Sequence, residues 1–257
     1  YKLGDLMKIG DKVVRKKYNR DVVFEIVDLK QNIAYLRGLE IRLIADSFLD
    51  DLEEAIEPWK TYQFDESKLL RQDKIIKGKI LHLDGDQEYL ELCEAKYKNL
   101  GVRAVGYYFK ENEMKEQVIG LLEKHHPQIL VITGHDSLSN HLEKDHLDRY
   151  SHSRDYVETI KKARQYESNY DQLVIFAGGC QSHYEALIAA GANFASSPSR
   201  KNIHALDPVY IAFQVANESV KNYIDIETII KNTYNKGEGI GGIDTKGVAR
   251  NIYPRKG

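Results

Sequence analysis

The sequence predicts an α/β fold in which a mainly parallel β-sheet carries helices on both faces, with a small β domain before it. From residue 78 onward, short apolar runs alternate with amphipathic segments, as is typical of repeated β-α-β units. The runs 129–132 and 173–177 are continuously apolar, which indicates strands buried on both faces of a parallel sheet. The first fifty residues contain only short β-branched runs, which predicts a separate β domain.

Residues 1–50 predict a small SH3-like or KOW-like β-barrel. Turn residues separate four short runs, at 11–15, 21–27, 33–37 and 40–44. We expect residues 1–6 to be an expression remnant, because Met7 opens a segment that looks like a natural start. Residues 51–76 are charged and polar and contain Pro58, so we interpret them as a linker.

Residues 77–257 predict the α/β domain, element by element. A strand at 79–83 precedes a helix that Asp86 caps and that ends near Leu100 and Gly101. A strand at 102–109, a helix ended by Pro127 and a strand from 128 follow, and then a polar loop at 136–152. We expect the remaining helices around 156–163, 181–190 and 226–234, and the remaining strands at 172–178, 193–196, 209–215 and 243–249.

Composition excludes several classes of protein. The net charge is -2 and the pI is about 6.6, which gives no reason to expect nucleic-acid binding. The sequence contains no signal-peptide pattern, and its apolar runs are far shorter than the roughly 20 residues of a membrane span. Two cysteines do not form a disulfide framework, so we expect a reducing compartment.

A histidine and a cysteine follow the two most apolar strands. His135 comes after the first strand and Cys180 after the second, 45 residues later. In parallel sheets chemistry gathers just beyond the carboxyl ends of the strands, so we expect the two residues at neighbouring strand ends. A cysteine beside a histidine is typical of nucleophilic catalysis.

The residues around Cys180 favour a catalytic role over simple packing. Gly178 and Gly179 permit a tight turn and close approach of a substrate backbone. A helix starting just after Cys180 would lower the pKa of its thiol. We expect the backbone N–H groups of Asp136 and Cys180 to stabilise an oxyanion. The alternative is that Cys180 is a small buried hydrophobe, which is how we interpret Cys93.

The order of the two residues separates families of cysteine enzymes. In class I glutamine amidotransferases the histidine usually follows the cysteine, whereas here His135 comes first. The present order resembles that of the caspase-like proteases, although the residues flanking the histidine and the cysteine differ from the caspase pattern.

Seven segments of the chain carry a resemblance to a known family: Val13–Tyr18, Arg42–Ser47, Leu81–Asp86, Ile129–Asp136, Asp171–His183, Ala190–Tyr210 and Gly241–Val248. Together they resemble the YabG family of sporulation-specific proteases. The resemblance covers nearly the whole chain, and the segment around 52–76 is short for the family. It implies a cysteine protease that cleaves spore coat and cortex-associated proteins after arginine, and possibly lysine, with catalytic residues at Cys180 and His135. It also implies synthesis in the mother cell, association with the forming coat, possible self-cleavage and no cofactor.

A preference for arginine calls for a carboxylate in the substrate pocket. In caspase-like folds the end of the first strand helps to line that pocket, and here this end carries Asp84 and Asp86. Asp86 has the alternative role of a helix cap. Asp207 is a second candidate, and we expect His204 and Gly178 to line the cleft.

Other polar residues leave alternatives open. His183 is an alternative base, and Asp136 is a candidate for orienting a histidine. His141, Asp145 and His146 have a spacing similar to metal ligands but lie in a polar loop, so we predict no metal site. Two rival functions remain: a hydrolase of small amides, and a non-enzymatic module for coat assembly.

Overall fold

The computed structural model describes residues 7–56, 75–139, 146–234 and 237–253 of the 257-residue chain. The chain divides into two compact units, Tyr1–Gln63 and Phe64–Gly257. Most of the segment that we interpreted as a linker, and residues 1–6, lie outside the described residues. Among the helices that are described, none is both long enough and apolar enough to cross a membrane.

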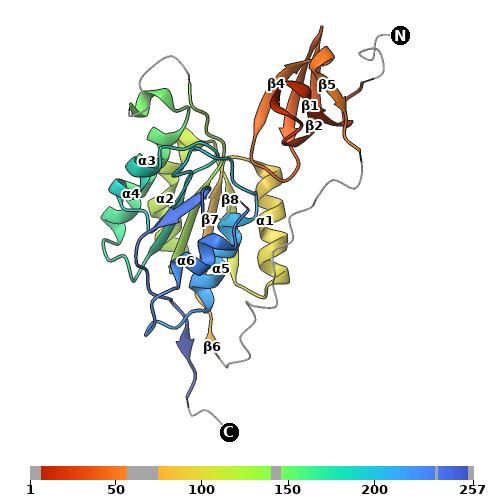
Figure 1. Ribbon diagram of the computed structural model, residues 1–257. Helices are drawn as coiled ribbons and strands as arrows, with labels where there is room; N and C mark the ends of the chain where they lie inside the picture. Colours follow the sequence, from red (N-terminus) through yellow and green to blue (C-terminus); the bar gives the residue numbers. More distant parts are fainter. Residues whose placement is uncertain (1–6, 57–74, 140–145, 235–236, 254–257) are drawn as a thin grey trace. The chain divides into compact units, whose positions relative to one another are not determined.

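The first unit is a five-stranded antiparallel sheet with the order β4-β3-β2-β1-β5 (Figure 1). Phe24, Ile26 and Leu36 alternate with more exposed residues and are fully buried. The prediction of a fourth strand at 40–44 was shifted, because Gly38 and Leu43 close a turn there and the strand follows it. The strands are β1 Lys12–Arg15, β2 Val23–Lys30, β3 Ile33–Gly38, β4 Ile44–Phe48 and β5 Leu52–Glu54.

The second unit is built on a six-stranded sheet with the order β12-β11-β10-β9-β7-β8 (Figure 1). All neighbouring strands are parallel except β12, which runs antiparallel to β11. β9 and β10 lie in the middle of the sheet and are buried throughout, as their apolar runs predict. The strands are β7 Ile80–Asp84, β8 Ala104–Tyr108, β9 Ile129–Thr133, β10 Val174–Ala177, β11 Phe194–Ser196 and β12 Ile240–Gly242.

Helices cover both faces of this sheet, as predicted (Figure 1). One face packs its leucines and isoleucines against α2, α3 and α4, with Met114, Tyr156 and Ile160 completely buried. The other face lies against α1 and α5. The helices are α1 Gln87–Asn99, α2 Glu111–His125, α3 Ser153–Tyr166, α4 Tyr184–Ala190, α5 Asp207–Asn217 and α6 Ile226–Lys231.

Two predicted strands were wrong. The segment 209–215 is not a strand but most of α5, and it is buried on nearly every side, so its composition resembles that of a buried strand. Pro208 at the start of α5 is the helix signal that the apolar run obscured. The segment 243–249 is not a strand either. The chain pairs just before it, in β12, and just after it, where β13 Arg250–Asn251 pairs with β6 Ile75–Ile76.

Candidate active site

The segments that follow β9 and β10 touch each other at the carboxyl edge of the sheet. A side chain built at Gly179 would place its Cβ 2.4 Å from the carbonyl oxygen of Gly134 and 3.2 Å from the backbone nitrogen of Asp136. The glycine is therefore required for the two backbones to meet. His135 and Cys180 are the residues next to this contact.

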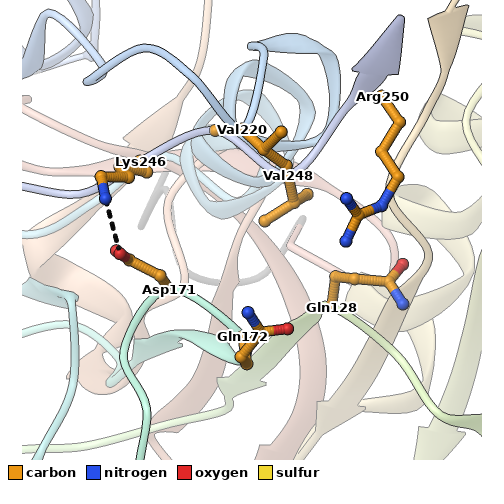
Figure 2. A pocket seen from close by; sticks show the side chains of 8 residues that line it. Gln128, Asp171, Gln172, Val220, Lys246, Val248 and Arg250 are labelled. Carbon is orange, nitrogen blue, oxygen red and sulfur yellow. Dashed lines mark ion pairs between the residues drawn. The ribbon is translucent and has the colours of Figure 1, made fainter. Parts of the chain in front are cut away.

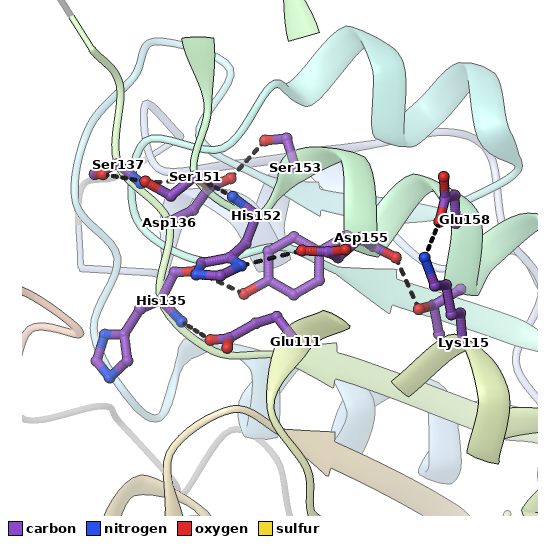
Figure 3. A network of polar contacts seen from close by, with 12 residues as sticks. Glu111, Lys115, His135, Asp136, Ser137, Ser151, His152, Ser153, Asp155 and Glu158 are labelled. Carbon is purple, nitrogen blue, oxygen red and sulfur yellow. Dashed lines mark hydrogen bonds and ion pairs between the residues drawn. The ribbon is translucent and has the colours of Figure 1, made fainter. Parts of the chain in front are cut away.

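The backbone of His135 is held on both sides. Its N–H donates to Oε1 of Glu111 at 2.8 Å, and its carbonyl accepts from the hydroxyl of Tyr156 at 2.9 Å. Figure 3 shows the His135 ring pointing away from Glu111. The Glu111 carboxylate fills the space beside two glycines, since a Cβ at Gly85 or Gly134 would lie within 2.4 Å of its Oε1. Sequence reasoning missed Glu111, because it looks like any acidic residue in the first turn of a helix.

The ring of His135 contacts a carboxylate. Its Nε2 lies 2.8 Å from Oδ2 of Asp86, and both side chains are largely buried. The other oxygen of Asp86, Oδ1, accepts the N–H groups of Glu88 and Tyr89, so the structure confirms Asp86 as the cap of α1. Nδ1 of His135 is buried and has no hydrogen-bond partner among the described residues.

Asp136 ties three segments of the site together. Its carboxylate accepts hydrogen bonds from the hydroxyl of Ser153 and from the N–H of His152 (Figure 3). It also accepts a hydrogen bond from the hydroxyl of Ser182. Ser182 in turn accepts the N–H of Gly179, so the turn around Cys180 is fixed to Asp136. Burial raises the pKa of Asp136, and these hydrogen bonds oppose that rise. Among the described contacts, Asp136 thus meets a histidine only through the backbone N–H of His152, and not through a histidine ring that it could orient.

Cys180 is fully buried under the segment that joins β11 to α5. The N–H of Ile203 donates to its Sγ at 3.4 Å, and Sγ lies 3.8 Å from the carbonyl oxygen of the same residue. Non-glycine residues with positive φ stand on both sides of this contact, at Gln181 (60°), Ser197 (72°) and Arg200 (55°). Residues in this region of φ cost energy and cluster at functional sites.

The helix after Cys180 begins later than predicted. Gln181 has a left-handed backbone and cannot start a helix, so α4 begins at Tyr184. His183 caps it, with Nδ1 accepting the N–H of Ala186. The first turn of α4 thus lies further along the chain than predicted, and it gives no geometric reason to expect a lowered pKa for the thiol of Cys180. Gly178 does take a conformation suited to glycine, with φ of 109°, and a Cβ there would lie 2.4 Å from Oγ of Ser196.

Asp84 lies in a polar network beneath the site. Its Oδ2 accepts the hydroxyl of Thr133 at 2.9 Å, and its Oδ1 accepts the N–H of Asp86 at 3.0 Å. His82 joins the network through Nε2, 2.7 Å from the Thr133 hydroxyl, and through Nδ1, 3.3 Å from the hydroxyl of Tyr97. Asp84 is completely buried, so in this conformation its carboxylate is turned to the protein and not to an open pocket.

The same network contains a group with metal-ligand chemistry. Ligand atoms of His82, Asp84 and Cys93 lie within 4.8 Å of one another. Both ring nitrogens of His82 and both oxygens of Asp84 already have protein partners, so we assign no metal to this group. Cys93 packs in the core, with its Sγ 3.5 Å from the carbonyl oxygen of Ala205. Of the metal-like trio in the polar loop, His141 and Asp145 lie outside the described residues.

Asp207 and His204 lie at the end of the segment that covers Cys180. Asp207 opens α5 and accepts the N–H groups of His204 and Tyr234. Nδ1 of His204 accepts the N–H of Leu206 at 3.1 Å. Burial raises the pKa of Asp207 to about 7, and the two hydrogen bonds oppose this rise only in part.

The raised pKa of Asp207 predicts that stability depends on pH. An unfolded chain ionises this group near its ordinary pKa of 3.8, whereas the folded protein keeps the proton up to about pH 7. The contribution is therefore largest in acid and is lost as the pH rises toward 7. At about 1.4 kcal/mol per pKa unit, it falls by up to about 3 kcal/mol between pH 5 and pH 8. Urea unfolding at the two pH values should show a smaller difference for Asp207→Asn than for wild type. Equal differences would contradict the assignment.

A polar pocket lies at the opposite edge of the sheet. Gln128 and Gln172 precede β9 and β10, and they line it together with Arg250 and the ion pair between Lys246 and Asp171 (Figure 2). The amino ends of the strands point here, whereas His135 and Cys180 follow the carboxyl ends. This pocket is therefore distinct from the candidate active site.

Comparisons with known proteins identify a family. The family described as YabG peptidase U57 matches residues 8–77 and 60–254. The chain is 44% identical over 285 aligned residues to the sporulation-specific protease YabG of Bacillus subtilis (strain 168), which covers 97% of this chain and 98% of that protein. No solved structure matches the chain.

Proposed function

The chain belongs to the YabG family of sporulation-specific proteases, and on that premise we propose that it is a cysteine endopeptidase with a caspase-like fold. Cys180 is the nucleophile and His135 transfers the proton. The observation that carries this proposal is the contact between Gly179 and the backbone of Gly134–Asp136 at the ends of two neighbouring parallel strands. The order of the two strands along the chain, histidine first, is the order that the caspase-like hypothesis requires.

The reaction follows from the groups at this edge. The sulfur of Cys180 attacks the carbonyl carbon of the scissile peptide bond, and a thioester forms as the amine leaves. His135 takes the proton of the thiol and then gives it to the leaving amine. Water then attacks the thioester, with His135 as base, and releases the acid and the free thiol. No cofactor takes part in these steps.

The N–H groups of Asp136 and Cys180 are our candidates for holding the oxyanion. The contact at Gly179 supports the first of them. Because Gly179 has no side chain, nothing at that position covers the backbone nitrogen of Asp136. Gly178 and Gly179 also allow a substrate backbone to come close to Cys180.

Substrate entry requires a movement. Cys180 is closed off by the backbone of Ile203, so a peptide reaches the sulfur only when the segment between β11 and α5 moves away. The strained residues Ser197 and Arg200 lie in that segment and are suited to such a change. His204 belongs to the same segment and would line the cleft once it opens.

We propose that the residue before the cut is arginine, or less often lysine. Four carboxylates lie at this edge, and together they would attract a cation that enters the site. They belong to Asp84 at the end of β7, Asp86 after it, Glu111 in α2 and Asp136 after β9. Of Asp84, Asp86 and Asp207, we favour Asp84 and Asp207 for direct contact, because the carboxylate of Asp86 already contacts α1 and the ring of His135. All three now bind groups of the protein itself, so an arginine would pair with one of them only in the opened site.

The proposed substrates are proteins of the spore coat and cortex, cut in the mother cell during spore formation. Self-cleavage is part of the same proposal. The family membership supports a protein substrate over a small amide, and it sets aside the non-enzymatic alternative of a coat-assembly module. The small β unit would recruit such substrates.

A cleavage-site profile tests the proposal. Wild-type protein is incubated with a denatured proteome, with Cys180→Ala as a matched blank, and the new termini are read by mass spectrometry. We expect new termini after arginine with wild type alone. Cuts after other residues would support the assignment as a protease but contradict the acidic pocket for arginine. Release of ammonia from free glutamine, without new termini, would favour the small-amide hydrolase instead.

A further inference from the structure

We propose that Asp86 is the positioning residue of the active site, which fixes the ring of His135 so that Nδ1 is the nitrogen that handles the proton. The inference rests on the proposed function, since it assigns a partner to the proposed proton carrier. It does not follow from the sequence, in which Asp86 precedes His135 by 49 residues.

The carboxylate of Asp86 is divided between two tasks. Oδ1 accepts the N–H groups of Glu88 and Tyr89, at 3.0 and 3.1 Å, and so locks the side chain to the first turn of α1. Oδ2 faces His135, 2.8 Å from Nε2. Because a helix cap holds one oxygen, the other has a fixed direction, which is the property a positioning group needs.

This contact decides which nitrogen of the ring carries the proton. An ionised carboxylate only accepts hydrogen bonds, so Nε2 must be the donor. In the neutral ring the lone pair then lies on Nδ1. Nδ1 is the nitrogen that is buried without a partner among the described residues, so it is available for the thiol and the leaving amine. The ring of Tyr89, 5.9 Å away, packs against the same imidazole.

Hydrogen bonds to the main chain of Asp86 support its assignment as the positioning residue. The N–H of Asp86 donates to Oδ1 of Asp84, whose Oδ2 accepts the hydroxyl of Thr133. Asp84 and Thr133 are both fully buried, on neighbouring parallel strands that end at this edge. The buried Asp84 thus fixes the main chain of Asp86, and Asp86 fixes His135. Outer contacts of this kind are what keep a catalytic side chain in place.

Two substitutions separate positioning from helix capping. In Asp86→Asn the amide oxygen keeps the cap, because an NH₂ group cannot accept the N–H groups of Glu88 and Tyr89. The NH₂ group then faces Nε2 and forces the proton onto Nδ1. Asp86→Ser also keeps a good cap but does not reach the ring. Asp225→Asn is the matched control, since Asp225 caps α6 through Thr228 and is far along the chain from this network.

We expect Asp86→Asn to lower kcat by about 10²- to 10⁴-fold with KM changed less than about threefold. The upper end is the loss caused by the equivalent change in a Ser-His-Asp triad. Asp86→Ser should lose about 10- to 100-fold, a typical loss when the partner that orients a functional histidine is removed. Both variants should melt close to wild type, and Asp225→Asn should keep full activity. ¹⁵N NMR of the histidine rings, with His135 assigned by its substitution, should show the proton on Nε2 in wild type and on Nδ1 in Asp86→Asn.

The outcomes distinguish this inference from the function on which it rests. If Cys180→Ala or His135→Asn retains wild-type activity, the proposed function fails. If both are inactive while Asp86→Asn keeps more than half of wild-type kcat, the dyad stands and the positioning role is overturned. A ring that carries its proton on Nδ1 in wild type, or that does not change in Asp86→Asn, overturns it as well.

Discussion

Replacing Cys180 by alanine is expected to reduce kcat/KM for an arginyl peptide by about 10⁴-fold or more. The side chain forms the covalent bond to the substrate, and removing a nucleophile leaves only the catalysis that binding and oxyanion contacts provide. The variant should stay folded and lose only about 1 kcal/mol of stability, since Cys180 is a small buried side chain whose described contacts are with the backbone of Ile203. The measurement is steady-state hydrolysis of the peptide, with a thermal melt of each variant.

The second cysteine of the chain is the matched control. Cys93 is as completely buried as Cys180, and its sulfur also contacts a backbone carbonyl. Cys93→Ala should cost about 1 kcal/mol or a little more of folding stability through lost packing and leave kcat unchanged. An arginyl chloromethyl ketone should add to Cys180 alone, which peptide mass spectrometry detects. Labelling of Cys93, or an active Cys180→Ala, would contradict the assignment of the nucleophile.

The central strands could be predicted from the sequence because burial on both faces leaves a plain signature. Ile129–Ile132 and Leu173–Ala177 are continuously apolar and flanked by polar or glycine residues, and no helix of that length is stable alone. The same signature misled at 209–215, since a helix packed on nearly every side is equally apolar. Only the tertiary environment separates the two cases.

The candidate site could be predicted only as far as strand ends. Parallel pairing places the residues after β9 and β10 together, so His135 and Cys180 could be proposed as a pair. The side chains and backbone groups that contact His135 and Cys180 could not be predicted. Asp86 contacts His135, and Ile203 covers Cys180, through side-chain directions and loop paths that local sequence does not specify. The sequence predicts Asp86 only as a helix cap or a pocket residue. The structure shows that one oxygen caps α1 while the other contacts the ring of His135.

Replacing His135 by asparagine is expected to lower kcat for a peptide bond by about 10³- to 10⁴-fold. Asparagine cannot pass a proton to the leaving amine, and general acid catalysis of this kind contributes about 10²- to 10⁴-fold. The loss should be smaller for a 4-nitrophenyl ester, because its leaving group departs without a proton. The comparison of amide and ester hydrolysis by the same variant measures this difference directly.

His183→Asn is the control that decides between the two candidate bases. His183 lies three residues after Cys180, and its Nδ1 accepts the N–H of Ala186 and so caps α4. Asparagine is a good cap, so the substitution preserves that role and removes only the imidazole. Because Nδ1 of His183 is engaged in the cap while Nδ1 of His135 is buried without a described partner, we expect His183→Asn to keep activity within about threefold of wild type. An inactive His183→Asn together with an active His135→Asn would transfer the base to His183. It would also make the contact between Asp86 and His135 a purely structural one.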